Sequence, residues 1–422
     1  MIEKIKENKW LVIGMIFIFA YFLIRFSQVD LTFGDDPWFR NYIDDGVFNF
    51  IGWRWNTWSS RIILEGILLI MLKFPSIIWR IITSLMLVLM DYSILKLLSR
   101  KQSLFFNIAV TVMLLSVDFS LYGGAGWYAT TINYIWVFGL GIYVLSFIPA
   151  LLKNEKIKGW QWFTIGVSVL ISSNQEQMCA LLVGFYGVAL LWNIFITKKK
   201  NACLLFVFGI CMVMLLIHLS CPGNAIRKVT ETQAYFPKYD RLGLFQKVYI
   251  GIMTTIAPFL RINNFQVIVY FISLIILSVI TKNKKIISIS FVPIILYGIM
   301  RYIVKYTTIP MFNSVLLYLD SNGKEIGIPQ ISKSAVLIFI VIVAIACLCI
   351  YITIKTCSKT TWIVCALLLA AAFCSRVILG FSASVFESGM RTLIFTYYLI
   401  GICDLYLINA IYTKKLIRRK TT

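Results

Sequence analysis

Two adjacent carboxylates, Asp35 and Asp36, stand in the stretch FGDDPWFRNY, immediately after the first long apolar run. A carboxylate beside a second one, partly desolvated where membrane meets water, has a raised pKa and can accept a proton. The same stretch also fits a helix start, with Asp36 as N-cap, Pro37 at the first helical position and Arg40 and Asp44 continuing an i,i+4 series of charges. The local pattern leaves both roles open, general base and helix cap.

The stretch GWRWNTWSSRIILEG follows in the same loop. Its tryptophans, including Trp55 and Trp58, fit an aromatic belt at the level of the lipid headgroups. They equally offer flat faces on which sugar rings can stack. Arg61 fits an i,i+4 ion pair with Glu65, or a phosphate site, because a guanidinium presents a fork of donors to an anion. We therefore include both tryptophans as candidate sugar-binding residues and Arg61 as a candidate phosphate ligand.

Two later polar stretches, SNQEQ and HLSCPGNAIRK, lie at the ends of apolar runs. Glu176 is the only charge of the first stretch, where it fits a solvated turn or an acceptor site. The second stretch has a Pro-Gly turn signal followed by Asn224 and Arg227, which are candidates for acceptor and phosphate binding. Its His218 is predicted to be a hydrogen-bonded residue at a helix end rather than a catalyst. A third stretch, GGAGWYATTINY, lacks the spacing of a nucleotide fingerprint, so it reads as a flexible loop.

Two further arginines complete the candidate phosphate ligands. Arg376 lies within an apolar run, where a charge is unfavourable unless it is paired or functional. Arg391 is spaced i,i+4 from Glu387, and this spacing fits an ion pair as well as it fits an anion site. These arginines add to a surplus of positive charge on the face where the positive-inside rule predicts little. Such a surplus requires an anionic partner, either lipid headgroups or a lipid-linked phosphate.

The rest of the chain must position these side chains, and its composition is that of a membrane protein. Of 422 residues, 60% are hydrophobic and 14% are charged, and the mean hydropathy is +0.85. Repeated apolar runs of about 20 residues are long enough to cross a bilayer as helices. The net charge of +22 comes mostly from short basic clusters between these runs, which favours a cytoplasmic positive face over nucleic-acid binding. The ten cysteines have no metal-binding spacing.

Placing each basic cluster in the cytoplasm predicts an all-α bundle with about 12 transmembrane helices and both termini inside. The predicted spans lie near residues 10–26, 75–98, 104–122, 132–152, 160–173, 178–197, 202–220, 265–281, 286–304, 333–355, 361–381 and 391–412. The first is expected to be retained as an anchor. Two shorter apolar stretches, 61–73 and 246–262, are predicted to be interfacial or re-entrant helices.

We predict one integral membrane domain over residues 1–422. Its larger loops all fall on the outer face: 27–60, 221–264 and 305–332. Functional residues concentrate on loops that a rigid scaffold holds, so the site is expected to face outward.

This layout resembles the GT-C superfamily of membrane glycosyltransferases: a first span, an outer loop that opens with an acidic pair, interfacial helices and many further spans. The stretches GDDPW, WNTWSSR and CPGNAIR resemble a bacterial group related to enzymes that decorate cell-surface polysaccharides with glucose or similar sugars. The layout covers most of the chain, whereas the motifs are short.

The resemblance implies a multi-pass protein of the cell membrane with a polyprenyl-phosphate sugar donor and a surface glycan acceptor. Asp35 or Asp36 would be the base that deprotonates the acceptor hydroxyl, and Arg61 and Arg227 would neutralise the leaving phosphate. Some members of the superfamily carry Asp-Glu instead of Asp-Asp, which leaves open which carboxylate acts. Some also use a divalent cation, although this sequence contains no complete metal site.

Two alternatives remain. A flippase or transporter of lipid-linked sugars would have many spans and cationic pockets, but the sequence lacks the paired halves that such proteins show. Its intramembrane acids are also few, and the main ones, Asp91 and Asp404, are expected to lie toward helix ends or packed interfaces. A polysaccharide polymerase or ligase would place its chemistry in a later outer loop, here 221–264, with Arg227 and Arg241 as its cations.

Overall fold

The computed structural model describes residues 8–198, 201–262, 264–306, 323–324 and 333–421. The chain forms two compact units, Met1–Arg227 and Lys228–Thr422. Helices make up both units, and no strand occurs among the described residues. The prediction of an all-α protein is therefore confirmed for this part of the chain.

The first unit contains three groups of helices. The helices of its N-terminal part are α2 (Lys9–Ser27), α3 (Asp35–Arg40), α4 (Val47–Thr57), α5 (Ile62–Lys73), α6 (Ser76–Leu97) and α7 (Leu104–Leu115). Those of its middle part are η1 (Phe119–Gly123), α8 (Trp127–Thr130), η2 (Thr131–Trp136), α9 (Val137–Leu145) and α10 (Ile148–Leu152). Then follow α11 (Gly159–Ser172), α12 (Glu176–Trp192), η3 (Asn193–Thr197) and α13 (Ala202–Ser220), and α14 (Gly223–Tyr235) runs across the boundary between the units.

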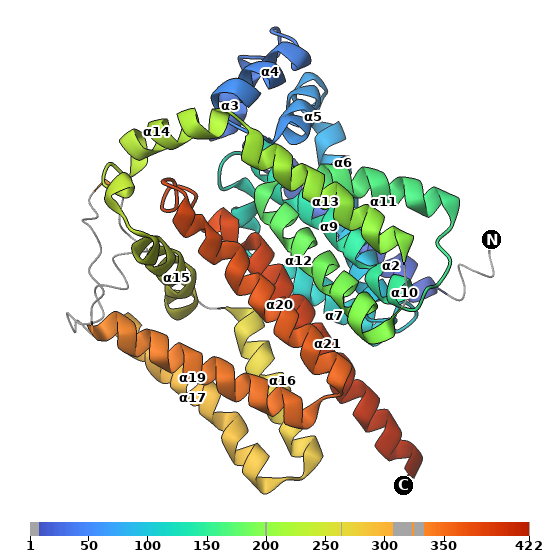
Figure 1. Ribbon diagram of the computed structural model, residues 1–422. Coiled ribbons are helices and arrows are strands. Elements are labelled where there is room, and N and C mark those ends of the chain that lie inside the picture. Colours follow the sequence, from blue (N-terminus) through green and yellow to red (C-terminus); the bar gives the residue numbers. More distant parts are fainter. Residues whose placement is uncertain (1–7, 199–200, 263, 307–322, 325–332, 422) are drawn as a thin grey trace. The chain divides into compact units, whose positions relative to one another are not determined.

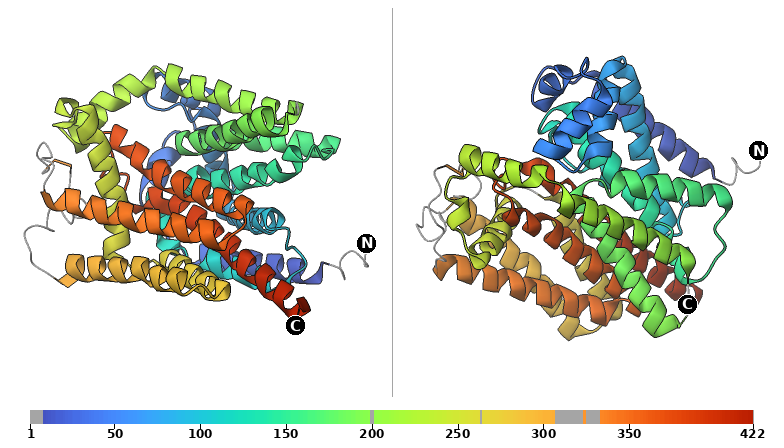
Figure 2. Two further views of the ribbon diagram at one scale, coloured as in Figure 1. Left: turned by 60° about the horizontal axis from the view of Figure 1, so that its bottom comes forward. Right: turned by 45° about the horizontal axis from the view of Figure 1, so that its top comes forward.

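The second unit is built mainly from long helices. In chain order they are η4 (Tyr239–Arg241), α15 (Leu244–Arg261), α16 (Phe265–Thr281), α17 (Lys284–Tyr306), α19 (Lys333–Thr356), α20 (Lys359–Val377), η5 (Ile378–Phe381), η6 (Met390–Leu393) and α21 (Ile394–Thr421). Helices α17 and α19 pack together, and α21 packs against both α20 and α16 (Figures 1 and 2). Most of the predicted outer loop 305–332 lies outside the described residues.

Within the described residues, nine helical segments are long and apolar enough to cross a membrane. A tenth crossing results if α15 and α16, which are bent by 79° relative to each other, form one span. Three of the 12 predicted spans correspond to the shorter helices α7, α11 and α16, which have 12, 14 and 17 residues. The chain is therefore a multi-pass helical membrane protein by length and composition, and the number twelve stays a prediction.

The core of the first unit forms where α6 packs against α2 and α9, and where α12 packs against α13 (Figure 1). Large aromatic side chains fill it. The Trp79 indole is fully buried, stacks on Tyr128 with ring centroids 4.6 Å apart, and donates to the Thr131 hydroxyl. Because Tyr128 and Thr131 belong to α8 and η2, this packing fixes the segment that the acidic pair contacts.

Candidate functional site

The Asp36 carboxylate caps a helix far away in the sequence. It is fully buried, and its two oxygens accept hydrogen bonds from the backbone N–H groups of Tyr128 and Ala129, both at 2.9 Å. These are N–H groups of the first turn of α8, which have no partner within their own helix. The N-terminus of a helix also favours a negative charge. Asp36 thus joins the loop 27–60 to the segment GGAGWYATTINY.

Glycines make this close approach possible. Gly34 and Gly126 both have positive φ angles, +72° and +97°, which side chains rarely tolerate. A Cβ atom on Gly126 would lie 2.6 Å from an Asp36 carboxylate oxygen, and one on Gly34 would lie 2.4 Å from the Gly126 nitrogen. The Asp35 backbone N–H donates to the Ala125 carbonyl at 2.9 Å. The glycine-rich stretch is therefore a docking surface for the acidic pair rather than a flexible loop.

The predicted capping of Asp36 on its own helix is wrong. Helix α3 begins at Asp35 after Gly34, so Asp36 and Pro37 lie inside its first turn. The i,i+4 charge series is also not formed, because Arg40 places its guanidinium 5.8 Å from the ring centroid of Tyr128. Asp35 itself is exposed at the start of α3. The two carboxylates therefore differ, since Asp36 is buried and Asp35 is exposed.

Burial determines the protonation of Asp36. Removal from water raises the pKa of its carboxyl to about 6, and the neighbouring Asp35 carboxylate adds to the effect. The backbone hydrogen bonds from Ala129, Tyr128 and Trp127 act in the opposite direction, because they stabilise the ionised form. The pKa is raised, as the sequence predicted for this pair, and the main cause is desolvation.

Asn174, in the stretch SNQEQ, performs the equivalent task for helix α5. Its side-chain oxygen accepts hydrogen bonds from the backbone N–H groups of Ile63 and Leu64 at 3.0 and 3.1 Å, and its amide donates to the Ser60 carbonyl. Because the first N–H groups of a helix require outside partners, this buried side chain fixes the start of α5. It thereby holds Arg61, the residue before α5, beside the start of α12.

Arg61 pairs with Glu176 across this junction. The Arg61 Nη2 and Nε atoms lie 2.6 and 2.7 Å from the Glu176 Oε2 atom, and Nη1 donates to the Asn133 side-chain oxygen at 3.3 Å. The expected pair of Arg61 with Glu65 is wrong, because Arg61 precedes the first turn of α5 and Glu65 faces the opposite direction, toward Arg54. The pair remains partly open to solvent.

Asn133 connects the Arg61 pair to the acidic pair. It lies in η2, a π-helical turn, and such turns often occur at functional sites. Its amide donates to the Ala129 carbonyl at 2.8 Å, and the Ala129 N–H donates to Asp36 at 2.9 Å. A continuous chain of hydrogen bonds therefore runs from the Asp36 carboxylate through Ala129 and Asn133 to the Arg61 guanidinium.

Asp36, Asn133, Arg61 and Glu176 form a polar cluster, and His218 lies beside it. Its Nε2 atom lies 2.8 Å from the Ser173 carbonyl oxygen and its Nδ1 atom lies 2.7 Å from the Ser60 hydroxyl. Since a carbonyl only accepts, Nε2 carries a proton, and in the neutral imidazole the Ser60 hydroxyl then donates to Nδ1. His218 is thus the hydrogen-bonded helix-end residue that the sequence predicted.

The stretch CPGNAIR packs directly on the tryptophan-rich loop. A Cβ atom on Gly223 would lie 2.4 Å from the Trp58 backbone nitrogen and 2.8 Å from the Trp55 carbonyl oxygen, so only glycine fits. The exposed Asn224 uses its amide to donate to the His218 carbonyl at 2.7 Å. Arg227 places its guanidinium 5.8 Å from the Trp58 ring centroid and is attracted by the Glu176 carboxylate. Trp55 and Trp58 are both half-buried in this contact.

A second, buried ion pair lies nearby and had no signal in the sequence. Arg54 donates from Nε and Nη2 to the two Glu65 carboxylate oxygens at 2.6 and 2.9 Å. The rings of Trp38, Trp53 and Trp58 surround its guanidinium at 5.1 to 6.0 Å. A bidentate pair enclosed by aromatic rings fixes α4 against α5.

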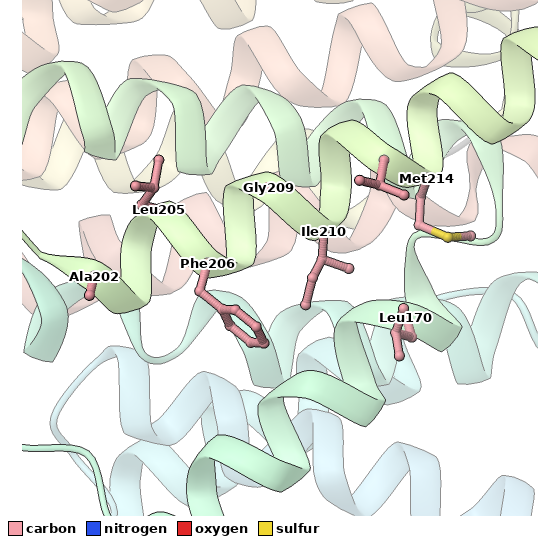
Figure 3. Close-up of a pocket in the computed structure, with 8 residues that line it drawn as sticks. Leu170, Ala202, Leu205, Phe206, Gly209, Ile210 and Met214 are labelled. Carbon is pink, nitrogen blue, oxygen red and sulfur yellow. The ribbon is translucent and has the colours of Figure 1, made fainter.

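An apolar groove lies along α11 and α13, with a volume of about 560 Å³ (Figure 3). Its lining includes Phe206, Ile210 and Met214 of α13 and Leu170 of α11. Met214 is one helical turn, about 6 Å along the axis, before His218. The lining of the groove has the chemistry of a hydrocarbon-binding surface.

The remaining predicted phosphate ligands, Arg376 and Arg391, belong to the second unit. Arg376 is buried near the end of α20, and its Nη1 donates to the Thr254 hydroxyl at 3.5 Å. Arg391 is half-buried in η6. The helical spacing that would pair it with Glu387 is not formed, because Gly389 between them has a φ of +60°. Whether these arginines bind an anion stays a prediction.

The donor set at the acidic pair does not fit a divalent cation. Both Asp36 oxygens already accept backbone hydrogen bonds, and the described residues contain no group of three or more His, Cys, Asp and Glu side chains that could hold a metal. The chemistry below therefore uses side chains alone. Searches against protein-family models, curated proteins and solved structures find no match to this chain.

Proposed function

We propose that this protein is a membrane glycosyltransferase that transfers a sugar from a polyprenyl-phosphate donor to a surface glycan on the outer face of the membrane. The observation that carries the proposal is the convergence of four separate polar stretches in one cluster. Arg61, Glu176, Arg227 and Asn133 come together there: hydrogen bonds connect Glu176, Arg61 and Asn133 to Asp36, and Arg227 is attracted by the Glu176 carboxylate. This proposal agrees with the expected GT-C layout, although that resemblance rests on the sequence motifs.

The charges of the cluster suit a phosphate. Around the two guanidinium groups of Arg61 and Arg227 there is one carboxylate, Glu176, and the nearby Arg54–Glu65 pair is neutral, while the acidic pair lies at the far end of the hydrogen-bond chain. An anion that approaches Arg61 and Arg227 therefore meets a net attraction, and guanidinium groups bind phosphate through paired donors. The polyprenyl chain would lie in the apolar groove of α11 and α13, which ends one turn before His218.

Asp35 is the better candidate for the base, because it is exposed whereas Asp36 is enclosed by backbone amides. In the proposed step, the Asp35 carboxylate takes the proton of an acceptor hydroxyl. The hydroxyl oxygen attacks the anomeric carbon, and the bond from that carbon to the phosphate oxygen breaks. Polyprenyl phosphate leaves with the electron pair, and Arg61 and Arg227 stabilise its growing negative charge. Asp36 acts as a positioning residue that anchors α3.

A flippase for lipid-linked sugars is the second candidate, and one observation favours it. Asp91 on α6 is fully buried, and neither of its carboxylate oxygens has a hydrogen-bond partner within the described residues. An unpaired acid inside a membrane span is typical of proton-coupled transport. Such a protein would move the same lipid between leaflets without cleaving it.

The test uses purified full-length protein in nanodiscs with a panel of polyprenyl-phosphate sugars, and it follows release of polyprenyl phosphate. We expect release that depends on an added glycan acceptor, is abolished in Asp35→Asn, and persists in Asp44→Asn, an exposed carboxylate of the same loop. Movement of fluorescent lipid-linked sugar between the leaflets of proteoliposomes, lost in Asp91→Asn and without any release, would overturn the proposal in favour of the flippase.

A further inference from the structure

A second groove, distinct from the polar cluster, lies on the first outer loop. It has a volume of about 500 Å³ and is lined by Tyr42, Asp45, Asn49, Phe50 and Trp53. This volume falls within the range of small-molecule sites, about 300 to 1,000 Å³. Phe50 is buried beneath it, whereas Trp53 remains 43% exposed. None of these residues takes part in the chemistry proposed above.

The aromatic wall of this groove is rigid. The rings of Tyr42 and Trp53 are stacked, with centroids 5.3 Å apart and planes 19° from parallel. Phe50 lies against both rings at 5.3 and 5.9 Å. The guanidinium of Arg54, fixed by its ion pair, lies 6.0 Å from the Trp53 ring centroid. A ligand that stacks on Trp53 therefore meets a surface that is already ordered, which lowers the entropy lost on binding.

Polar groups lie beside the aromatic wall. Asn49 and Trp53 are spaced i,i+4 on α4, so their side chains lie on one face of the helix, and Asp45, two residues before α4 begins, also lines the groove. The Asn49 amide donates to the Asp45 backbone carbonyl at 3.0 Å, which fixes the amide and leaves its oxygen as an acceptor. Among the described residues, the Asp45 carboxylate has no ion pair or hydrogen bond to a side chain. Two acceptors therefore stand beside an exposed indole.

This combination selects for a neutral sugar. A sugar ring has an apolar C–H face that stacks on an aromatic ring, and an edge of hydroxyl groups that donate to carboxylate and amide oxygens. A phosphate headgroup is disfavoured, because Asp45 and the neighbouring Asp44 place negative charge at the groove. A purely lipid-inserting face is also disfavoured, since it would not align an acid and an amide with the aromatic rings.

We propose that the Tyr42–Trp53 groove binds sugar rings of the acceptor glycan. The identity of the ligand as an acceptor rests on the proposed function, whereas saccharide binding as such does not. Trp53 supplies the stacking surface, and Asp45 and Asn49 accept hydrogen bonds from neighbouring hydroxyl groups. The groove would hold the polymer while its terminal hydroxyl reaches the acidic pair.

The experiment screens the full-length protein, in nanodiscs of zwitterionic phosphatidylcholine, against neutral oligosaccharides that contain glucose, galactose or N-acetylglucosamine. Saturation-transfer difference NMR then measures Kd for the sugars that bind. We expect Trp53→Ala and the surface variant Asn49→Ala each to weaken binding by about tenfold. Phe48→Ala is the matched control: Phe48 is an aromatic residue of the same helix, 86% exposed and outside the groove, and its Kd should not change.

The results separate this inference from the proposed function. The proposal that the groove binds saccharides is wrong if the wild-type protein binds none of the sugars, or if Phe48→Ala weakens binding as much as Trp53→Ala does. If the donor is cleaved while no saccharide binds, the glycosyltransferase stands and the groove fails. If saccharides bind through Trp53 and Asn49 while no donor is ever cleaved, the groove stands and its role as an acceptor site fails. Thermal unfolding of Asn49→Ala shows that a loss of binding is not a loss of fold.

Discussion

Two arginine–glutamate pairs of the first unit, Arg54–Glu65 and Arg61–Glu176, have the same chemistry in different surroundings. The side chains of the first pair are 9% and 6% exposed, and those of the second are 21% and 37% exposed. Aromatic rings enclose Arg54, whereas Arg61 contacts the polar side chain of Asn133. Both glutamates belong to helices, α5 and α12, whose starts lie beside the tryptophan-rich loop.

The difference concerns what each arginine can do. Arg54 already uses two donors on one carboxylate in a closed, apolar surrounding, so no ligand can reach it without unfolding the loop. Arg61 lies at a partly exposed junction, and the same Glu176 carboxylate attracts a second cation, Arg227. The enclosed pair therefore fixes the architecture, and the open pair is available to an anion. The following experiments test this division of roles.

The largest effect is expected from breaking the enclosed pair. Arg54→Ala leaves the buried Glu65 carboxylate without its partner, and such a loss destabilises a protein by about 3 to 5 kcal/mol. We expect a marked fall in the thermal unfolding temperature in detergent. The double variant Arg54→Met with Glu65→Leu removes both charges and should recover most of the loss. If Arg54→Ala unfolds at the wild-type temperature, the pair has no architectural role.

Breaking the open pair should affect turnover more than stability. Arg61→Ala is expected to lower donor turnover by about 100-fold or more, as removal of a group that stabilises developing charge does. Its unfolding temperature should change much less than that of Arg54→Ala, because a partly exposed ion pair contributes little to stability.

Arg241→Ala is the control for this variant. Arg241 is an exposed arginine of the 221–264 loop, and its removal should leave turnover unchanged. A larger loss of turnover in Arg241→Ala than in Arg61→Ala would instead favour the polymerase or ligase alternative.

The difference between the two ion pairs could not be predicted from the sequence alone. Hydropathy predicted an all-α membrane protein, and residue types identified the stretches that meet in the cluster. Local spacing failed where the true partner lies far away in the chain. Asp36 caps backbone amides 92 and 93 residues away, and Asn174 caps amides 111 and 110 residues away. A backbone amide has no residue type, so nothing in the sequence marks it as a partner.

The pairing of Arg61 shows a second limit of prediction from local spacing. An i,i+4 spacing predicts an ion pair only if both residues lie on one helix, and Arg61 lies just before α5 begins. The pairing of Glu387 with Arg391 fails for a related reason, since Gly389 interrupts the helical path between them. Helix ends are the hardest feature to predict from a sequence, so the ion-pair partners of charged residues at helix ends are equally hard to predict.

The titration of Asp36 provides a further test of the region that holds the open pair. Burial raises the pKa of this carboxyl from 3.8 to about 6. Between these values the folded protein binds the proton more tightly than the unfolded chain does. The stabilisation is therefore fully present below about pH 4 and is lost as the pH rises through about 6. Its upper limit is about 3 kcal/mol, since one pKa unit corresponds to about 1.4 kcal/mol.

Thermal unfolding from about pH 4 to about pH 7 measures this effect. We expect the wild-type unfolding temperature to fall across the range more steeply than that of Asp36→Asn, which cannot titrate. Asp44→Asn, at an exposed carboxylate, should retain the wild-type profile. Identical profiles for Asp36→Asn and the wild type would mean that folding does not raise the pKa of Asp36 at its position against α8.

The smallest expected effect comes from Gly223, which contacts the backbone between the two pairs. Gly223→Ala places a Cβ 2.4 Å from the Trp58 nitrogen, and overpacking of this kind destabilises by about 1 to 3 kcal/mol. Gly184→Ala is the control: no neighbouring atom lies within 4 Å of its added Cβ, so the helix should gain about 0.5 to 1 kcal/mol.

The readouts of Gly223→Ala also distinguish the two pairs from each other. The Trp58 ring lies 5.6 Å from the Arg54 guanidinium and 5.8 Å from that of Arg227, so a shift of Trp58 reaches both regions. If the open region carries the chemistry, donor turnover in folded Gly223→Ala should fall by more than the loss of stability accounts for. A proportionate fall in both would mean that Trp58 transmits the change to the enclosed pair alone, and that Arg227 does not position the donor.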